Sequence, residues 1–300
     1  MSLVTVAALQ YPISFLNTFE EWQKKTEMWV QSSVLKQAQI ILFPEYGSME
    51  LTSLLRENDR KKLKSQAQLL KVFLPQFIQT FQNLAEQYKC YIIAPSFPYF
   101  VDESLTNNRV FVFAPNRQFE HQDKFFMTRF EDEDWGVQAG EKTVKIFKTE
   151  NFKFSISTCF DVEFAWPSCV AAQNGAEIIF VPSCTETMKG ANRVHIGARA
   201  RALENQVYTV VSQTVGVAEW SPAVDLNSGF AAVYAPPDLG FTEDGVIAKG
   251  NTNKEDILIS ELNLSLIKNV RQNGAVLNYQ HHEKLLSNLQ SPFKVVTINI

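Results

Sequence analysis

Short apolar runs without polar alternation place the tightest limit on how this chain can fold. Two clear examples are IILF at residues 40–43 and EIIFVPS at residues 177–183. A strand that is apolar on both faces must be covered on both, which is typical of sheets that carry helices. Between residues 19 and 39, mostly apolar residues recur every three or four positions, which places them on one face of a predicted amphipathic helix. The alternation of such strands and helices predicts an α/β protein.

The rest of the chain gives a full set of predicted elements. Further helices are expected at 60–89, disturbed at Pro75, and at 164–174 and 192–204. The hairpin-like middle of the chain predicts a mixed sheet. No linker or repeat interrupts the pattern, so we expect one domain, with a polar C-terminal tail from about residue 275. The predicted strands are 4–9, 40–43, 91–96, 109–115, 118–123, 143–149, 152–158, 177–183, 207–214, 229–236 and 256–262.

Charge and cysteine content narrow the class of protein. The net charge of −4, with acidic and basic residues interspersed, argues against nucleic acid or a membrane surface as the main partner. Residues 1–12 lack the basic start of a signal peptide, and no window reaches the ~18 apolar residues of a membrane span. Neither the four cysteines nor the four histidines have metal-ligand spacing. We therefore expect a cytoplasmic protein with free thiols that needs no metal or cofactor.

Three predicted strand ends carry residues that are suited to chemistry. Glu45, Lys124 and Cys159 each come within two residues of such an end. Each alone has a structural alternative: a solvated acid, a lysine that packs its stem on apolar surface, or a core thiol. A thiol attacks as the thiolate, whose pKa of about 8.5 falls beside a cation or at a helix N-terminus. With Lys124 as the cation and Glu45 as the proton acceptor, the three predict acyl transfer through a thioester.

The segments around these residues resemble the nitrilase superfamily of carbon–nitrogen hydrolases, in its amidase-like branch. The resemblance covers residue 4 to about residue 273. It implies a four-layer αββα sandwich with two mixed β-sheets, and a homodimer or larger assembly. The segments that carry it are VAALQYP, FPEYGSMEL, DKFFMT, STCFDVEF, GAEIIFVPSCTE and ARALENQVYTVVSQTVG.

The resemblance also implies roles for individual residues. Glu45 matches the general base, Cys159 the nucleophile, and Lys124 the residue that stabilises the tetrahedral intermediate. The backbone N–H of Phe160, directly after the nucleophile, is expected to complete the oxyanion hole.

A second glutamate often follows the lysine in this family and helps to hold the substrate. The acidic run here offers Glu131, Asp132 and Glu133, and spacing favours Glu131. We expect Glu186 either to meet an amino group of the substrate or to be a solvated loop acid. Other residues expected along the pocket are Tyr46, Trp135, Cys184 and Thr185, with Trp220 as a further candidate for its wall.

Two segments depart from the usual pattern of the family. The lysine is followed by two phenylalanines instead of the common K-x-H, and CFDVEFAW replaces a helix start that usually bears arginine. Both departures put the substrate in question more than the reaction. Asp161 and Glu163 are expected in the first turn of a helix after the nucleophile, where negative charge is favourable. Arg201 and Glu204 are expected to be structural.

The sequence thus predicts a thiol-dependent hydrolase of a small, non-peptide carbon–nitrogen bond, with a linear amide as the first expectation. A nitrilase acting on a C≡N group and an N-carbamoyl-amine hydrolase remain alternatives, because each passes through a similar thio-linked intermediate. The partner would be a small amide or nitrile. A non-catalytic binding module of the same fold is a more distant alternative, as is a redox sensor.

Overall fold

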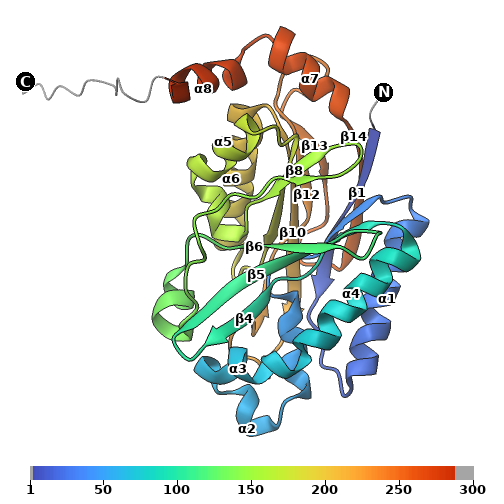
Figure 1. The fold of residues 1–300 in the computed structure, drawn as a ribbon, viewed down its shortest axis with the longest axis vertical. Helices are drawn as coiled ribbons and strands as arrows, with labels where there is room; N and C mark the ends of the chain where they lie inside the picture. The colour runs from blue at the N-terminus through green and yellow to red at the C-terminus, as the bar shows by residue number, and fades with distance from the viewer. Residues whose placement is uncertain (1–2, 288–300) are drawn as a thin grey trace, which may run out of the picture.

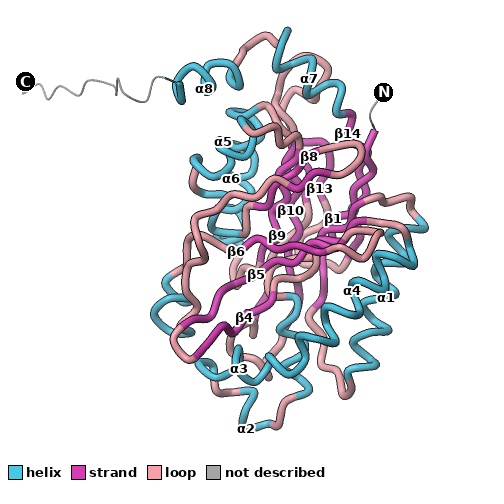
Figure 2. The backbone as a smooth tube through the Cα atoms, viewed as in Figure 1, coloured by secondary structure: helices cyan, strands magenta, loops and turns pink. Residues whose placement is uncertain are grey.

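The computed structural model describes residues 3–287, whose strands form one curled mixed sheet with helices around it (Figures 1 and 2). The strands are β1 (Leu3–Pro12), β2 (Ile40–Leu42), β3 (Tyr91–Ile93), β4 (Phe97–Asp102), β5 (Leu105–Phe113), β6 (Phe119–Asp123), β7 (Phe147–Lys148), β8 (Lys153–Ile156), β9 (Ile178–Ser183), β10 (Tyr208–Val217), β11 (Leu226–Asn227), β12 (Ala232–Tyr234), β13 (Val246–Lys249) and β14 (Asp256–Asn263).

The α-helices flank this sheet. They are α1 (Phe19–Leu35), α2 (Glu57–Arg60), α3 (Gln66–Leu70), α4 (Leu74–Tyr88), α5 (Ala165–Gln173), α6 (Met188–Asn205), α7 (Leu264–Asn273) and α8 (Asn278–Ser287). In Figure 1, α1 and α4 lie together on one side of the sheet, and α5 and α6 lie together on the other.

Strand β1 lies in the middle of the sheet and determines much of its form. It runs parallel to β2 and β10 and antiparallel to β14. The strand order across the sheet is β4-β5-β3-β2-β1-β10-β9-β8-β7. Both faces of β1 are buried, because Val6 and Ala8 contribute to one core while Leu9 and Tyr11 contribute to another. This explains why its sequence shows no polar alternation.

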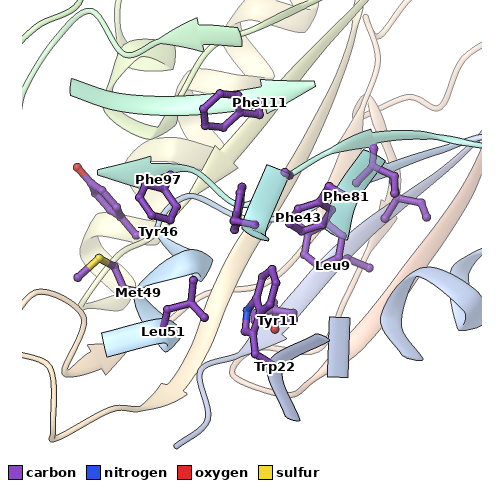
Figure 3. Close-up of a cluster of buried hydrophobic side chains, with 14 of the residues drawn as sticks. Leu9, Tyr11, Trp22, Phe43, Tyr46, Met49, Leu51, Phe81, Phe97 and Phe111 are labelled. Atoms are coloured by element: carbon purple, nitrogen blue, oxygen red, sulfur yellow. The ribbon is translucent and has the colours of Figure 1, made fainter. Parts of the chain in front are cut away.

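Buried side chains form separate clusters on the two faces of the sheet. One cluster packs α1 and α4 onto the sheet and includes Trp22 and Phe81 (Figure 3). A second cluster joins inward-facing residues from distant strands, such as Val6 of β1 and Phe180 of β9. A third packs α6 onto β9 and β10 and includes Val194.

The predicted α/β class is confirmed, and most predicted strands and helices are present. The strand pairings connect all fourteen described strands into one sheet, whereas the resemblance implies two. The four-layer sandwich therefore stays a prediction.

The predicted helix at 60–89 is broken into shorter pieces. We expected Pro75 to disturb the interior of this helix. It instead lies in the first turn of α4, where proline is well tolerated. At the other end of the chain, the predicted polar tail begins with helix α8, which contacts α5 and α6. Gln206 fixes this helix by accepting a hydrogen bond from the backbone N–H of Tyr279 at 3.1 Å. Residues 288–300 of the predicted tail lie outside the described residues.

None of the helices within residues 3–287 combines the length and the apolar character that crossing a bilayer requires.

Candidate active site

A pocket of about 290 Å³ opens where strands β2, β6, β8 and β9 end. Its wall contains the residues predicted as the triad, Glu45, Lys124 and Cys159. The other residues predicted for the site also line it: Tyr46, Glu131, Trp135, Phe160, Cys184, Thr185 and Glu186. Trp220 does not line this pocket, and its ring instead packs edge-on against Phe15.

Glu45 is buried and follows β2 after Phe43 and Pro44, and both of its carboxylate oxygens accept hydrogen bonds. Oε1 accepts from Nζ of Lys124 at 2.8 Å and from Nδ2 of Asn108 at 2.8 Å. Oε2 accepts from the backbone N–H of Cys184 at 3.0 Å. These donors fix the orientation of the carboxylate at the base of the pocket.

Lys124 follows β6 and connects two carboxylates. Its Nζ donates to Glu45 and, at 2.7 Å, to Oε2 of Glu131. Burial acts to lower the pKa of Lys124, but the facing charges of Glu131 and Glu45 outweigh it and hold the pKa well above its usual value. The lysine is therefore a fixed positive charge inside the pocket.

Glu131 lies in the short π-helix η4 (Phe130–Trp135) and faces the site, whereas Asp132 and Glu133 of the same acidic run are exposed. Oε1 of Glu131 accepts from the Tyr46 hydroxyl at 2.7 Å. Oε2 accepts from the backbone N–H and the hydroxyl of Thr128, both at 2.9 Å. Burial acts to raise the pKa of Glu131, but Lys124 and these donors lower it below its usual value, so Glu131 stays charged.

Cys159 begins the short 3-10 helix η5 (Cys159–Glu163), which follows β8 after Ser157 and Thr158. Its φ of 47° lies in the left-handed region, which is strained for a residue with a side chain and is frequent at functional turns. Cys159 is 5% exposed. Its Sγ accepts from the Ser183 hydroxyl at 3.2 Å. Burial and the charge of Glu45 raise the pKa of the Cys159 thiol well above its usual value, although Lys124 acts to lower it.

Asp161 lies in the first turn of a helix, as predicted, but this helix is the 3-10 helix η5, and α5 starts only at Ala165. Asp161 is buried, and its Oδ1 accepts from the backbone N–H groups of Phe125 at 3.1 Å and Phe126 at 2.8 Å. It therefore anchors the loop that carries Lys124, a tertiary contact that sequence spacing does not reveal.

Glu163 was predicted in a first helical turn, but it ends η5 and precedes α5, so this prediction was wrong. It lies on the pocket wall and forms an ion pair with Arg193 at 3.3 Å. Arg201 is nearly buried and donates to the carbonyl oxygen of Val162 at 3.0 Å, and it also pairs with Glu204. This arrangement holds η5 against α6, as expected for a structural pair.

Sequence reasoning missed Asn108 on β5. Its Nδ2 lies 2.8 Å from Oε1 of Glu45 and 3.2 Å from Oε1 of Glu131, so one amide links the two carboxylates. The available signal was a polar residue at the start of the apolar run RVFVF, which predicts an inward-facing polar group with a partner.

We also searched the structure for side chains that could hold a metal ion. Across the described part of the chain, no group of three or more His, Cys, Asp or Glu side chains is placed to hold a metal ion. Glu45 and Glu131 instead accept hydrogen bonds from Lys124, Asn108 and backbone N–H groups.

Relatives of known name share this chain's sequence over most of its length. The probable hydrolase YhcX of Bacillus subtilis is 32% identical over 288 residues, which cover 96% of this chain and 55% of YhcX. The chain thus spans about half the length of that relative. The deaminated glutathione amidase of a Synechocystis strain is 26% identical over 285 residues, covering 91% of this chain and 97% of the relative.

Solved structures show the same fold. Nit3 of Saccharomyces cerevisiae, a member of branch 10 of the nitrilase superfamily, superposes with a TM-score of 0.70 at 20% identity, covering 90% of this chain and 94% of Nit3. A carbon–nitrogen hydrolase from Helicobacter pylori G27 superposes with a TM-score of 0.75 at 16% identity, covering 97% and 99% of the two chains.

The sequence model of the carbon–nitrogen hydrolase family matches residues 5–272, most of the chain. This match includes Glu45, Lys124 and Cys159. The chain therefore belongs to the carbon–nitrogen hydrolase family.

Proposed function

We propose that this protein is a thiol-dependent amidase that cleaves a small, non-peptide, linear amide through a thioester on Cys159. The contacts of Lys124 carry the proposal: its Nζ lies 2.8 Å from Glu45 and 2.7 Å from Glu131, on the pocket wall that also holds the thiol. A nucleophile, a base and a fixed cation in one buried pocket are the groups that acyl transfer requires. The amidase names of several relatives favour the same reaction.

In the first step Sγ of Cys159 attacks the carbonyl carbon, and its proton passes to Glu45. Because burial and Glu45 raise the pKa of the thiol, it is protonated in the resting site. Burial also raises the pKa of Glu45, although Lys124 opposes this shift. A carboxylate with a raised pKa accepts a proton more readily, which suits a general base that works near neutral pH.

The carbonyl oxygen gains negative charge as the carbon–sulfur bond forms. Lys124 and the backbone N–H of Phe160 stabilise this charge in our proposal. Loss of one such donor typically costs about 3–4 kcal/mol of barrier. Glu131 keeps Lys124 charged and oriented, and its place on the pocket wall lets it contact the amide as well.

The intermediate then collapses. Glu45 returns its proton to the nitrogen, the carbon–nitrogen bond breaks, and ammonia or an amine leaves. A water molecule attacks the thioester while Glu45 takes a proton from it. The carbon–sulfur bond breaks, the acid leaves, and the proton returns to sulfur. Each bond that breaks is thus matched by a proton that Glu45 carries.

The test is ammonia or amine release from a panel of linear amides, nitriles and ureido acids. We expect turnover with amides and none with the Cys159→Ala variant. Turnover confined to nitriles or to ureido acids would assign the protein to one of those two alternatives. No turnover of any member would favour a binding module.

We also propose the architecture and assembly that the resemblance implies. The separate buried clusters, with α1 and α4 on one side and α5 and α6 on the other, support a four-layer αββα sandwich within a single domain. A homodimer or larger assembly in the cytoplasm completes the proposal.

A further inference from the structure

A chain of buried polar groups leads from the nucleophile into the core. The Ser183 hydroxyl lies 3.2 Å from Sγ of Cys159, and Nε2 of Gln213 lies 3.3 Å from Oγ of Ser183. Oε1 of Gln213 lies 3.1 Å from Nε2 of His195, whose Nδ1 lies 2.9 Å from the Tyr234 hydroxyl. All five residues are buried. The proposed reaction gives no role to this series of hydrogen-bonded groups.

The direction of each hydrogen bond follows from one backbone contact. The N–H of Phe230 can only donate, and it points at Oε1 of Gln213 at 2.9 Å. This fixes which end of the Gln213 amide is oxygen. His195 must then donate from Nε2 to the same oxygen. Its Nδ1 carries no proton and accepts from the Tyr234 hydroxyl.

The other end of the Gln213 amide determines the state of Ser183. The NH₂ group donates to Oγ of Ser183, so this hydroxyl accepts from Gln213 and must send its own proton elsewhere. The other hydrogen-bond neighbour of that hydroxyl, within the described residues, is Sγ of Cys159. Every hydrogen bond along the chain therefore points toward the nucleophile.

We infer that Ser183 is a further catalytic residue, whose hydroxyl donates a hydrogen bond to the Cys159 sulfur and stabilises its thiolate. Gln213 and His195 are positioning residues that hold the hydroxyl proton in this direction. A hydrogen bond to a charged acceptor is stronger than one between neutral groups, so this donor helps most when the sulfur becomes negative. The inference deepens the proposed function and rests on Cys159 as its nucleophile.

The charged groups around both ends of the chain agree with this role. At the sulfur, Glu45 acts to raise the pKa of the Cys159 thiol, and Lys124 and the Ser183 hydroxyl act to lower it. Ser183 thus partly offsets the burial of the thiol.

At the end of the hydrogen-bonded series that lies away from Cys159, His195 stays uncharged. Burial lowers the pKa of His195 to about 4, and the nearby charge of Lys249 also lowers it. Lys249 lies 4.5 Å above the ring of Phe230, which stacks on His195 at 3.8 Å. Because His195 is neutral near pH 7, it acts by fixing hydrogen-bond direction, without adding a charge.

The test is the pH dependence of iodoacetamide modification at Cys159, located by peptide mass. For Ser183→Ala we expect the midpoint to rise by about one pH unit and the rate at pH 7 to fall roughly tenfold. Ser183→Thr keeps a hydroxyl and should restore most of the rate. Ser212→Ala is the matched control, since this buried hydroxyl on β10 donates to the carbonyl oxygen of Leu9 and should leave the midpoint unchanged.

A second variant tests whether Gln213 directs the Ser183 hydroxyl proton toward the Cys159 sulfur. Gln213→Glu keeps an acceptor for Phe230 and His195 but removes the NH₂ donor, so the Ser183 proton turns away from the sulfur. We expect a higher midpoint than in the parent protein. Combined with Ser183→Ala, this substitution should add little, because both act through one hydroxyl. Fully additive shifts would show that Gln213 acts independently of Ser183 and would overturn its positioning role.

The inference fails if Ser183→Ala shows the midpoint and rate of the parent protein. This readout needs no substrate, so it is separate from the proposed amidase reaction. Loss of turnover in Cys159→Ala together with an unshifted midpoint in Ser183→Ala would retain the proposed function and reject the role of Ser183. A shifted midpoint in a protein that hydrolyses no amide would do the reverse.

Discussion

Nζ of Lys124 lies 2.8 Å from Oε1 of Glu45, and both side chains are only 1% exposed. An ion pair this deeply buried is favourable only when further hydrogen bonds satisfy its remaining atoms. Here Asn108 and the backbone N–H of Cys184 donate further hydrogen bonds to Glu45, and Lys124 also donates one to Glu131. The network holds the base beside the thiol, so we expect stability and activity to depend on the same atoms.

Replacing Lys124 tests this dependence directly. Lys124→Met leaves two carboxylates buried without their cation, so we expect the free energy of unfolding to fall by about 3–5 kcal/mol and amide turnover to disappear. Urea unfolding and ammonia release measure the two effects. Arg129→Ala is the control, because it removes an exposed pair with Glu133 and should change neither quantity. A Lys124→Met protein as stable as the parent would contradict the account.

Glu45→Gln should lower turnover while making the Cys159 thiol easier to ionise. The amide cannot accept the thiol proton, so turnover should fall by about 10²–10⁴-fold. The charge of Glu45 raises the pKa of Cys159, so its removal should lower the pH midpoint of iodoacetamide modification at that residue. Glu133→Gln, on the exposed part of the acidic run, should affect neither. A higher midpoint in Glu45→Gln would show that this charge does not oppose the thiolate.

His195 should make the fold sensitive to acid. Burial lowers its folded pKa from 6.5 to about 4, so the neutral form contributes stability above pH 6.5 that is lost as the pH falls through 4. This loss amounts to about 3 kcal/mol. His195→Gln should remove that part of the slope in unfolding measured from pH 7 to 4, whereas His281→Gln, on exposed α8, should retain it. Equal slopes in parent and His195→Gln would contradict the prediction.

Tyr46 should matter for both stability and turnover. Its hydroxyl donates to Oε1 of Glu131 at 2.7 Å, so Tyr46→Phe should cost about 1.5–3 kcal/mol and lower turnover, because Glu131 holds Lys124. Tyr208→Phe removes a hydroxyl that donates to the carbonyl of Asn263 at 3.3 Å, away from the pocket. It should lower stability by about 0.5–1.5 kcal/mol while turnover stays constant. Loss of turnover in Tyr208→Phe would mean that activity reports general destabilisation.

Glu186 tests the chemistry of the substrate. It is exposed at the pocket wall, where its charge can meet an amino group. Glu186→Gln should reduce the preference for amine-bearing over neutral amides by about two- to fivefold in kcat/KM, the range of an exposed ion pair. Asp132→Asn, outside the pocket, should leave the preference unchanged. The same preference in Glu186→Gln would remove this interpretation.

The sequence was sufficient to predict the α/β class, because strands that are buried on both faces show as uninterrupted apolar runs. The strands around Ile40 and Ile178 illustrate this. It was less informative about short or half-exposed elements such as β4, β11 and β13, whose residues pair with a neighbouring strand without an apolar period of their own. It also treated the start of α8 as tail, although tertiary contacts with α5 and α6 accompany that helix.

The residues of the site also divide into some that the sequence could predict and others that it could not. Glu45, Lys124 and Cys159 lie at strand ends that the topology brings together, and strand ends are visible in sequence. Asp161 and Ser183 act across the fold, through the Lys124 loop and the nucleophile sulfur respectively. Such contacts depend on which strands become neighbours, which spacing along the chain does not state.

Intact mass spectrometry of the protein mixed with an excess of a linear amide tests whether Cys159 forms an acyl thioester. We expect a transient mass increase equal to the acyl group, located at Cys159 and absent from Cys159→Ala. Turnover by Cys159→Ala at the parent rate, or an adduct carried by another residue, would contradict it.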